Sequence, residues 1–230
     1  MQIESALIVV LFAAVAGIFW YLCWKADQER MRAMQKLASD HGWTWYEEDS
    51  RFVRDDSGTP FGQGRSRRAE NVLVGTHRGR QIVAYDYEYK TDSGSGNNRS
   101  TKTHEYAIWL VTLPHRLPDL EVRPEGIFGG RVAGALGFGD LELESEAFNQ
   151  AYRVDCDDNR YGTAMLHPRM MELLLAAAAS GGVSWRIESD VLVCWEQDRA
   201  DPASIVARLD LLADIIELVP SFVWKDFGST

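Results

Sequence analysis

The pattern of apolar positions begins with an unbroken hydrophobic run near the N-terminus. No charged residue occurs between Ser5 and Trp24. About twenty helical residues at ~1.5 Å each span ~30 Å, the thickness of a bilayer's hydrocarbon core. Trp20, Tyr21 and Trp24 gather at one end of the run, and such amphipathic rings favour the headgroup region. We therefore predict a transmembrane helix over residues 3–24, with the lipid bilayer as the partner of this segment.

A cleaved secretory signal is the alternative interpretation of the same run. Signal peptides begin with a basic segment, have a shorter apolar stretch and end in small residues. Here the residues before the run include no Lys or Arg, and bulky aromatic residues occupy its far end, including the positions before Cys23. The pattern favours a retained anchor.

The charges that flank the run predict its orientation. Lys25, Arg30, Arg32 and Lys36 follow it, and no Lys or Arg precedes it. Because positive charges remain on the cytoplasmic side, the N-terminus is expected outside and the C-terminal domain in the cytoplasm. The chain is thus predicted to be a single-pass protein of the cell membrane.

The helical pattern continues beyond the anchor. Apolar residues recur at three-to-four spacing from Met31 to Ala38, and Gly42 is a suitable residue to end a helix. We predict a juxtamembrane helix over residues 26–42 that packs on the domain. A dimerising coiled coil is the alternative, but the segment is too short to establish a heptad register.

Strand patterns follow, separated by polar segments. Residues 71–76 and 81–89 predict a hairpin around Gly79, and the valine and tyrosines of the second strand share one face. A third strand over 104–113 completes an antiparallel meander. The sequence also predicts a strand at 43–46, loops at 49–70 and 91–103, and a short strand at 120–122.

The C-terminal part mixes short strands and helices. Ser145 is a suitable cap for a helix over 146–151, and Asp201 with Pro202 is typical of the start of the last helix, which Pro220 ends. The remaining expectations are strands at 140–144 and 152–156, a helix from Pro168 to the glycines at 181–182, and a hairpin of 185–188 with 191–195 around Ser189 and Asp190.

These elements predict an α+β fold: an N-terminal transmembrane helix, then a mainly antiparallel β-sheet domain with two or three packed helices. The expected divisions are an anchor at 1–25, the juxtamembrane helix at 26–42 and a soluble domain at 43–230, with a possible subdivision near 115–140.

The amino-acid composition argues against several classes of protein and of function. Hydrophobic residues make up 46% of the 230-residue chain, which is too many for a disordered protein. The net charge of −10 argues against nucleic-acid binding, because that affinity comes largely from Lys and Arg. The three cysteines form no C-x-x-C pair.

One block of the C-terminal half resembles a known group. It contains Leu143–Asn149, then Tyr152-Arg-Val, Asp157-Asp158, and Ala164–Leu174 with its Pro-x-x-Met-Glu helix. Over residues 140–195 the chain resembles an uncharacterised, actinobacterial-type family of bacterial membrane-anchored proteins. The function of that group is unknown, so the resemblance implies a bacterial inner-membrane protein and no activity.

No candidate motif establishes a chemical site. The glycines of 129–139 lack the strand–loop–helix context and spacing of a nucleotide-binding loop. His77, His104, His115 and His167 lack metal-ligand spacing, and Cys156 and Cys194 lie in strand patterns that suggest buried residues. The acidic zone around 140–167 (Asp140, Glu142, Glu144, Glu146, Asp155, Asp157 and Asp158) is expected to be a solvated face rather than a Ca²⁺ or Mg²⁺ site. We therefore assign no catalytic, cofactor-binding or metal-ligating residue.

Three functional hypotheses follow. The favoured one is a membrane-tethered, cytoplasmic-facing module that binds or scaffolds another protein. The second is an enzyme with an unrecognised site near the acidic zone and His167, which requires a carboxylate and a histidine in one pocket. The third is a small-molecule or lipid sensor, which requires a deep apolar pocket lined by Tyr85, Tyr87 or Trp109.

Overall fold

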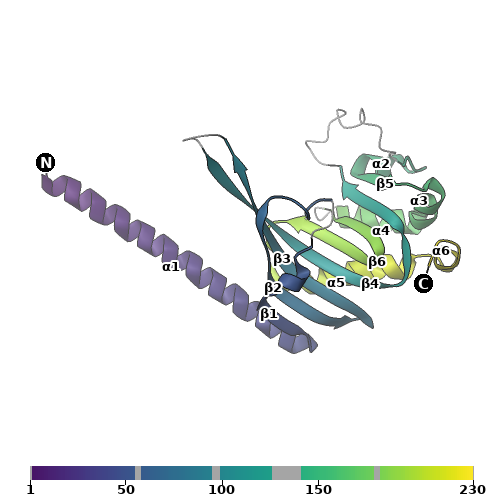
Figure 1. Cartoon of the computed structure of the whole chain (residues 1–230), viewed down its shortest axis with the longest axis horizontal. Helices are drawn as coiled ribbons and strands as arrows, with labels where there is room; N and C mark the ends of the chain where they lie inside the picture. The colour runs from purple at the N-terminus through teal and green to yellow at the C-terminus, as the bar shows by residue number, and fades with distance from the viewer. Residues whose placement is uncertain (1, 55–57, 95–98, 126–140, 179–181, 230) are drawn as a thin grey trace.

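A long N-terminal helix leads into one mixed helix-and-sheet domain (Figure 1). The structure is a computed structural model of the chain. It describes all residues except 1, 55–57, 95–98, 126–140, 179–181 and 230, and for residues 2–13 it describes the helical backbone but no side chains. Helix α1 runs from Gln2 to His41 and joins the predicted anchor and juxtamembrane helix in one element. Gly42 follows it with φ +68°, the left-handed conformation predicted for a residue that ends a helix.

Six strands of the described chain form one antiparallel sheet. Strand β4 is central: its first half pairs with β3 and its second half with β5, while β6 pairs with both halves from the other side. Strands β2 and β1 extend the sheet beyond β3. The strands are β1 Thr44–Glu48, β2 Arg65–His77, β3 Arg80–Ser93, β4 Ser100–Pro124, β5 Tyr152–Cys156 and β6 Ser184–Gln197.

Shorter helices surround the sheet, and several begin at the predicted caps. Oγ of Ser145 accepts a hydrogen bond from the backbone N–H of Phe148, and the carboxylate of Asp201 accepts one from Ala203. The helices are η1 Ser50–Phe52, α2 Glu146–Ala151, α3 Asn159–Met165, α4 Pro168–Ala178, η4 Pro202–Ser204, α5 Ile205–Leu218 and α6 Ser221–Asp226. The sequence analysis did not predict α3 or α6.

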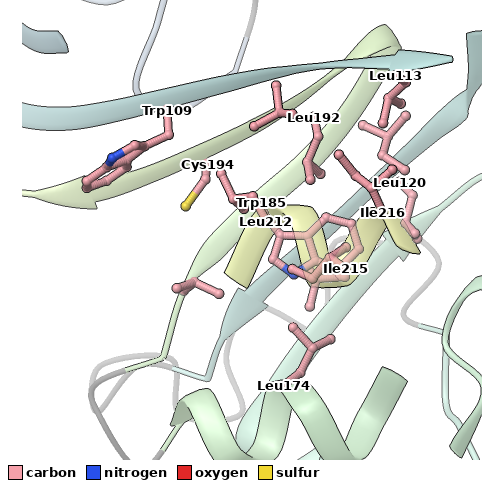
Figure 2. Close-up of a cluster of buried hydrophobic side chains, with 14 of the residues drawn as sticks. Trp109, Leu113, Leu120, Leu174, Trp185, Leu192, Cys194, Leu212, Ile215 and Ile216 are labelled. Atoms are coloured by element: carbon pink, nitrogen blue, oxygen red, sulfur yellow. The ribbon is translucent and has the colours of Figure 1, made fainter. Parts of the chain in front are cut away.

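The two faces of the sheet carry separate cores. The larger core packs Trp109 and Trp185 from the sheet against Leu174 of α4 and Leu212 of α5 (Figure 2). The smaller core lies on the other face, where the segment containing η1 and Phe61 packs against the tyrosines of β3. The predicted alternation of β3 is confirmed, because the two sets of side chains divide between the cores: Tyr85, Tyr87 and Tyr89 on one face, Ile82 and Ala84 on the other.

The last turns of α1 pack on the edge of the larger core. Met34 and Ala38 are buried there, and the ring of Trp43 covers Gly75 so closely that a Cβ at residue 75 would lie 2.1 Å from the ring. Packing on the domain, the favoured interpretation of residues 26–42, is therefore confirmed. Within the part of the chain that the structure describes, no helix combines the length and the apolar character needed to cross a membrane.

The predicted hairpin of 185–188 with 191–195 is wrong. Ser189 does adopt a left-handed conformation, with φ +59°, but the chain bends there and continues as the single strand β6. The two halves of β6 pair with β4 rather than with each other, and β4 has a matching irregularity between Thr112 and Leu117. Ser189, which the sequence analysis assigned to a tight turn, therefore lies at a bend that β6 shares with β4.

Other boundaries also differ from the prediction. The predicted strands 104–113 and 120–122 are both parts of the single strand β4. Residues 65–70 belong to β2 rather than to a loop, and the polar segment 91–103 contributes the ends of β3 and β4. Pairing with neighbouring strands overrides the polar composition of these segments. The described part of the predicted strand 140–144, residues 141–144, is not a strand; residue 140, the whole glycine-rich segment 129–139 and Gly181 lie outside the described residues.

Candidate functional site

A buried ion pair holds the second half of α1 against the sheet. The guanidinium nitrogens of Arg30 lie 2.8 and 2.9 Å from the two carboxylate oxygens of Asp86, which is 3% exposed. Asn71 donates a further hydrogen bond to Asp86 over 3.0 Å, and Arg30 also donates to the carbonyl oxygen of Ala200. Because an uncompensated charge at such depth is strongly destabilising, this pair fixes the position of α1 on the sheet.

Arg199 adds a second charged contact beside this pair. Its Nε lies 2.9 Å from the carboxylate of Glu105, and its other nitrogens lie 3.4 Å from Asp27 of α1 and 3.7 Å from Glu70 of β2. Together the two arginines connect α1 with β2, β3 and β4. A groove of about 320 Å³ lies at this junction, lined by charged residues of both signs and by Trp24.

The first half of α1 has a different surface. Large apolar side chains are exposed there, each by between 51% and 71%. At about 100° per residue the consecutive members of this group point to all sides of the helix, so no single protein face covers them. The exposed set is Val15, Ile18, Phe19, Trp20, Tyr21, Leu22 and Trp24. Contiguous apolar surface of this kind is typical of protein–protein or membrane contacts.

A second polar feature lies on the sheet face that carries the smaller core. Arg186 of β6, Glu121 of β4 and Asp155 of β5 are direct neighbours across three adjacent strands. They line a depression of about 190 Å³ together with Asp119, Asp157, Glu188 and backbone neighbours. We call this depression the acidic pocket, because its carboxylates outnumber its single arginine.

Arg186 is the buried centre of the acidic pocket, with 5% exposure. It is paired with Glu188, and its Nη1 donates to the carbonyl oxygen of Thr59 over 2.6 Å. Its guanidinium lies over the rings of Phe61 and Trp195, 5.5 and 5.1 Å from their centroids. Nη2 of Arg186 is buried and has no hydrogen-bond partner among the described residues. Arg186 therefore forms part of the pocket wall, held by Glu188 and by the carbonyl oxygen of Thr59.

Burial also changes the acidity of the pocket. Desolvation raises the pKa of Glu121 above its usual value of 4.5, although Arg123 and Arg186 act in the opposite direction. Nε of Arg123 lies 2.7 Å from the Glu121 carboxylate and partly neutralises it. The pocket therefore holds a carboxylate whose charged form costs more free energy than it would in water.

The Glu121→Gln variant is expected to gain stability relative to the native chain as the pH rises. A carboxyl group whose pKa is raised by folding binds its proton more tightly in the folded state. Its contribution to stability is therefore full at low pH and is lost as the pH rises from 4.5 through the raised pKa. Glutamine keeps an acceptor for Arg123 and does not ionise. Urea unfolding of both chains at about pH 4 and about pH 7 checks this. The prediction is contradicted if the free energy of unfolding of the variant, minus that of the native chain, does not rise from pH 4 to pH 7.

The histidines singled out in the sequence do not meet in one site. His77 bonds to Asp210 over 2.8 Å, His104 to Thr91 over 2.9 Å, and His167 to the carbonyl oxygen of Leu218 over 2.9 Å. His115 lies beside the ring of Trp224. No described histidine lines the acidic pocket, and no described group of three His, Cys, Asp or Glu side chains is placed to hold a metal ion.

The acidic zone divides between several roles. Asp155 and Asp157 line the acidic pocket, whereas Asp158 caps α3 by accepting hydrogen bonds from the backbone N–H groups of Arg160 and Tyr161. Glu142, Glu144 and Glu146 lie elsewhere on the surface, and Asp140 is outside the described residues. Among the described residues, neither His167 nor another histidine therefore joins the carboxylates of the acidic pocket, as the enzyme hypothesis required. His104 lies apart from this zone, in a separate depression that Glu105 and Asp198 also line.

The aromatic face of the sheet is filled rather than open. Tyr85 and Tyr87 are at most 2% exposed beneath Phe52 and Phe61, and Trp109 belongs to the core of the opposite face. The sensor hypothesis required a deep apolar pocket at these residues, so a filled core argues against that hypothesis. The cysteines at 156 and 194 are buried thiols, as expected; burial raises the pKa of both, that of Cys194 to about 12.

Comparison with solved structures identifies a similar protein, the mycobacterial trehalose monomycolate transport factor A, TtfA. The TM-score is 0.59 over 83% of this chain and 96% of that one, at 12% sequence identity. The two chains share a fold. At 12% identity, the similarity shows a shared fold and does not extend to function. Its mycobacterial source agrees with the actinobacterial character of the resemblance over residues 140–195, while no family model and no curated protein matches the sequence.

The sequence analysis did not identify the residues that form the Arg30–Asp86 pair and the acidic pocket. Arg186 stands next to Trp185 in a strand pattern, where nothing marks it as buried, and Arg30 and Asp86 are 56 positions apart. One signal was present: Asp86 interrupts the apolar and aromatic pattern of β3 on the face that packs against α1. A charged residue in such a position requires a partner of opposite charge.

Proposed function

We propose that the chain is a single-pass membrane protein that holds its α+β domain at the cytoplasmic face of the membrane, where the domain binds another protein of that membrane. The observation that carries the proposal is the division of α1. Its first half exposes large apolar side chains on all sides, and its second half is fixed to the domain by the Arg30–Asp86 pair. A helix of this kind places a rigid domain at a defined distance from the bilayer.

The anchor itself, residues 3–24, is supported by the apolar run and by the ring of aromatic residues at its end. The cations that follow it support a cytoplasmic domain. We further propose the division into an anchor at 1–25, a juxtamembrane helix at 26–42 and a domain at 43–230. In this arrangement Trp24 and the groove beside it lie at the membrane surface.

We infer the cellular process in which the domain takes part from the fold that it shares with TtfA. TtfA is a transport factor for trehalose monomycolate. A domain of the same fold on a membrane anchor is suited to an accessory role in lipid transport, in which it binds a membrane protein rather than performing chemistry. The dispersal of the candidate histidines and the filled aromatic face support binding over the enzyme and sensor alternatives.

The acidic pocket is the proposed docking point for the partner. Its carboxylates suit a basic side chain, which a peptide loop with an exposed Lys or Arg supplies. Charged residues at the rim of an interface determine mainly which partner binds.

Photocrosslinking in intact membranes tests this proposal. A photoreactive residue at the exposed position 157 should give a discrete adduct with a membrane protein, and the same residue at the exposed position 169 on α4 should not. Asp119→Lys together with Asp155→Lys should reduce the adduct about tenfold or more, because like charges then oppose the basic partner. Equal adducts from positions 157 and 169, or an adduct unaffected by the charge reversals, would contradict it.

A further inference from the structure

We propose that the far end of the β3–β4 hairpin binds the anionic phospholipid headgroups of the membrane and gives the domain a second contact with the bilayer. The residues involved are Arg65 at the start of β2, Lys90 of β3, Arg99 just before β4, and Lys102 near the start of β4, where that strand pairs with β3. This inference rests on the proposed anchor, because α1 sets the position of the hairpin relative to the membrane.

Two contacts with α1 and the residues just after it show the direction in which β3 runs. Nε1 of Trp43, just after α1, donates to the carbonyl oxygen of Thr76, and Thr76 is paired with Gln81 of β3. Further along β3, Asp86 bonds to Arg30, which lies more than three turns closer to the N-terminus of α1. The strand therefore runs along α1 toward the membrane-spanning end.

The lengths of the two elements then place the hairpin. From Arg30 to Trp24 the helix advances six residues, or about 9 Å at 1.5 Å each. From Asp86 to Ser93 the strand advances seven residues, or about 23 Å at 3.3 Å each. The hairpin is thus long enough to reach the level of Trp24, where the headgroups lie, even where β3 runs at an angle to α1. Figure 1 shows the hairpin leaving the sheet on the same side as the N-terminal half of α1.

The charges at this end differ from those of the whole chain. The chain has a net charge of −10, yet the four cations named above outnumber the carboxylates of Glu88, Asp92 and Glu105 on the described part of the hairpin. Asp92 gathers two of the cations: Arg65 lies 2.8 Å from it and Arg99 3.3 Å. The side chains of Arg65 and Arg99 remain 56% and 69% exposed, so both guanidinium groups can also reach phosphate.

The composition of the hairpin favours a lipid surface over a protein partner. Residues 91–103 include no apolar side chain. A protein interface needs a desolvated apolar centre, whereas basic segments near a membrane are attracted to anionic lipids without insertion. The hairpin would therefore touch the headgroups and orient the sheet, without adding a second anchor.

A label on the hairpin tests this directly. The full chain with Cys23→Ser and Ser100→Cys is labelled at residue 100 with a fluorophore, since the two remaining cysteines are buried. It is then placed in nanodiscs of phosphatidylcholine alone or mixed with phosphatidylglycerol. Quenching by acrylamide, an uncharged aqueous quencher, should fall by about twofold in the anionic discs, and the difference should disappear near 1 M salt because charges are then screened.

Two sets of substitutions show whether the hairpin cations are responsible. Replacing Arg65, Arg99 and Lys102 with glutamine should abolish the protection. Replacing the exposed Arg160, Arg169 and Lys225 at the other end of the domain with glutamine should leave it unchanged. Circular dichroism confirms that each variant is folded.

The outcomes separate this inference from the proposals it depends on. Equal quenching in both kinds of disc, or loss of protection in the distant control, would overturn the hairpin contact while leaving anchor and partner binding intact. A chain that does not enter the discs at all would overturn the anchor, and the hairpin contact with it. Failure of the photocrosslinking experiment alone would affect only the partner.

Discussion

Replacing Val15 and Ile18 with arginine is expected to remove the chain from the membrane. An arginine near the centre of a spanning helix opposes insertion by about 2.5–3.5 kcal/mol, whereas the aliphatic residues that it replaces favour insertion by about 0.3–0.6 kcal/mol each. The two substitutions together therefore oppose insertion by about 6 kcal/mol, or a factor of ~10⁴. Both native side chains are more than half exposed, so the sheet and its cores lose no contact.

Flotation of cell membranes on a density gradient measures this effect. The native chain should float with the lipid, and the doubly substituted chain should remain in the soluble fractions. The matched control adds the same two charges further along α1, as Ala33→Arg with Gln35→Arg at exposed positions beyond the proposed anchor, and should float like the native chain. Flotation of the Val15 and Ile18 variant to the same extent would show that another part of the chain holds it on the membrane.

Asp86→Ala is expected to destabilise the domain by about 3 kcal/mol. Breaking a buried ion pair by removing one partner costs about 3–5 kcal/mol, because the other charge is left without compensation. Here the lower end applies, since the side chain of Arg30 is 18% exposed and can draw on water. Asn71 also loses the acceptor for its buried side chain. The second half of α1 should separate from the sheet before the cores unfold.

Urea unfolding of the full chain in detergent micelles measures the loss. Asp40→Ala is the matched control, because Asp40 and Lys36 form an exposed pair on the same helix, and such pairs contribute at most about 1 kcal/mol. The double variant Arg30→Ala with Asp86→Ala should be less unstable than the sum of the single variants, since no unpaired charge remains. An Asp86 variant as stable as the Asp40 variant would show that the pair does not hold the helix.

Local signals in the sequence predicted the elements whose cause is local. The alternation of β3 assigned its tyrosines to one face, and Ser145, Asp201 and Gly42 mark helix ends as expected. These features depend on residues within one or two turns of each other. The same reasoning misplaced Ser189, because a left-handed residue serves equally in a tight turn and in a bend of two long strands.

The charged features could not be predicted, because they depend on pairings across the whole fold. The acidic pocket exists only once β4, β5 and β6 bring Glu121, Asp155 and Arg186 into one row. The Arg30–Asp86 pair likewise requires α1 to pack against the sheet with Arg30 at the level of Asp86, a packing that no periodicity encodes. The sequence predicted that carboxylates gather near residue 155, but a buried arginine among them depends on tertiary structure.

Protease protection tests the central claim, that α1 anchors a domain facing the cytoplasm. Protease is added to intact spheroplasts and, separately, to inverted inner-membrane vesicles, and the chain is followed by antibodies against the domain. The account predicts a full-length chain in spheroplasts and complete loss of the domain in inverted vesicles. Digestion of the domain in intact spheroplasts, with survival in the inverted vesicles, would contradict it.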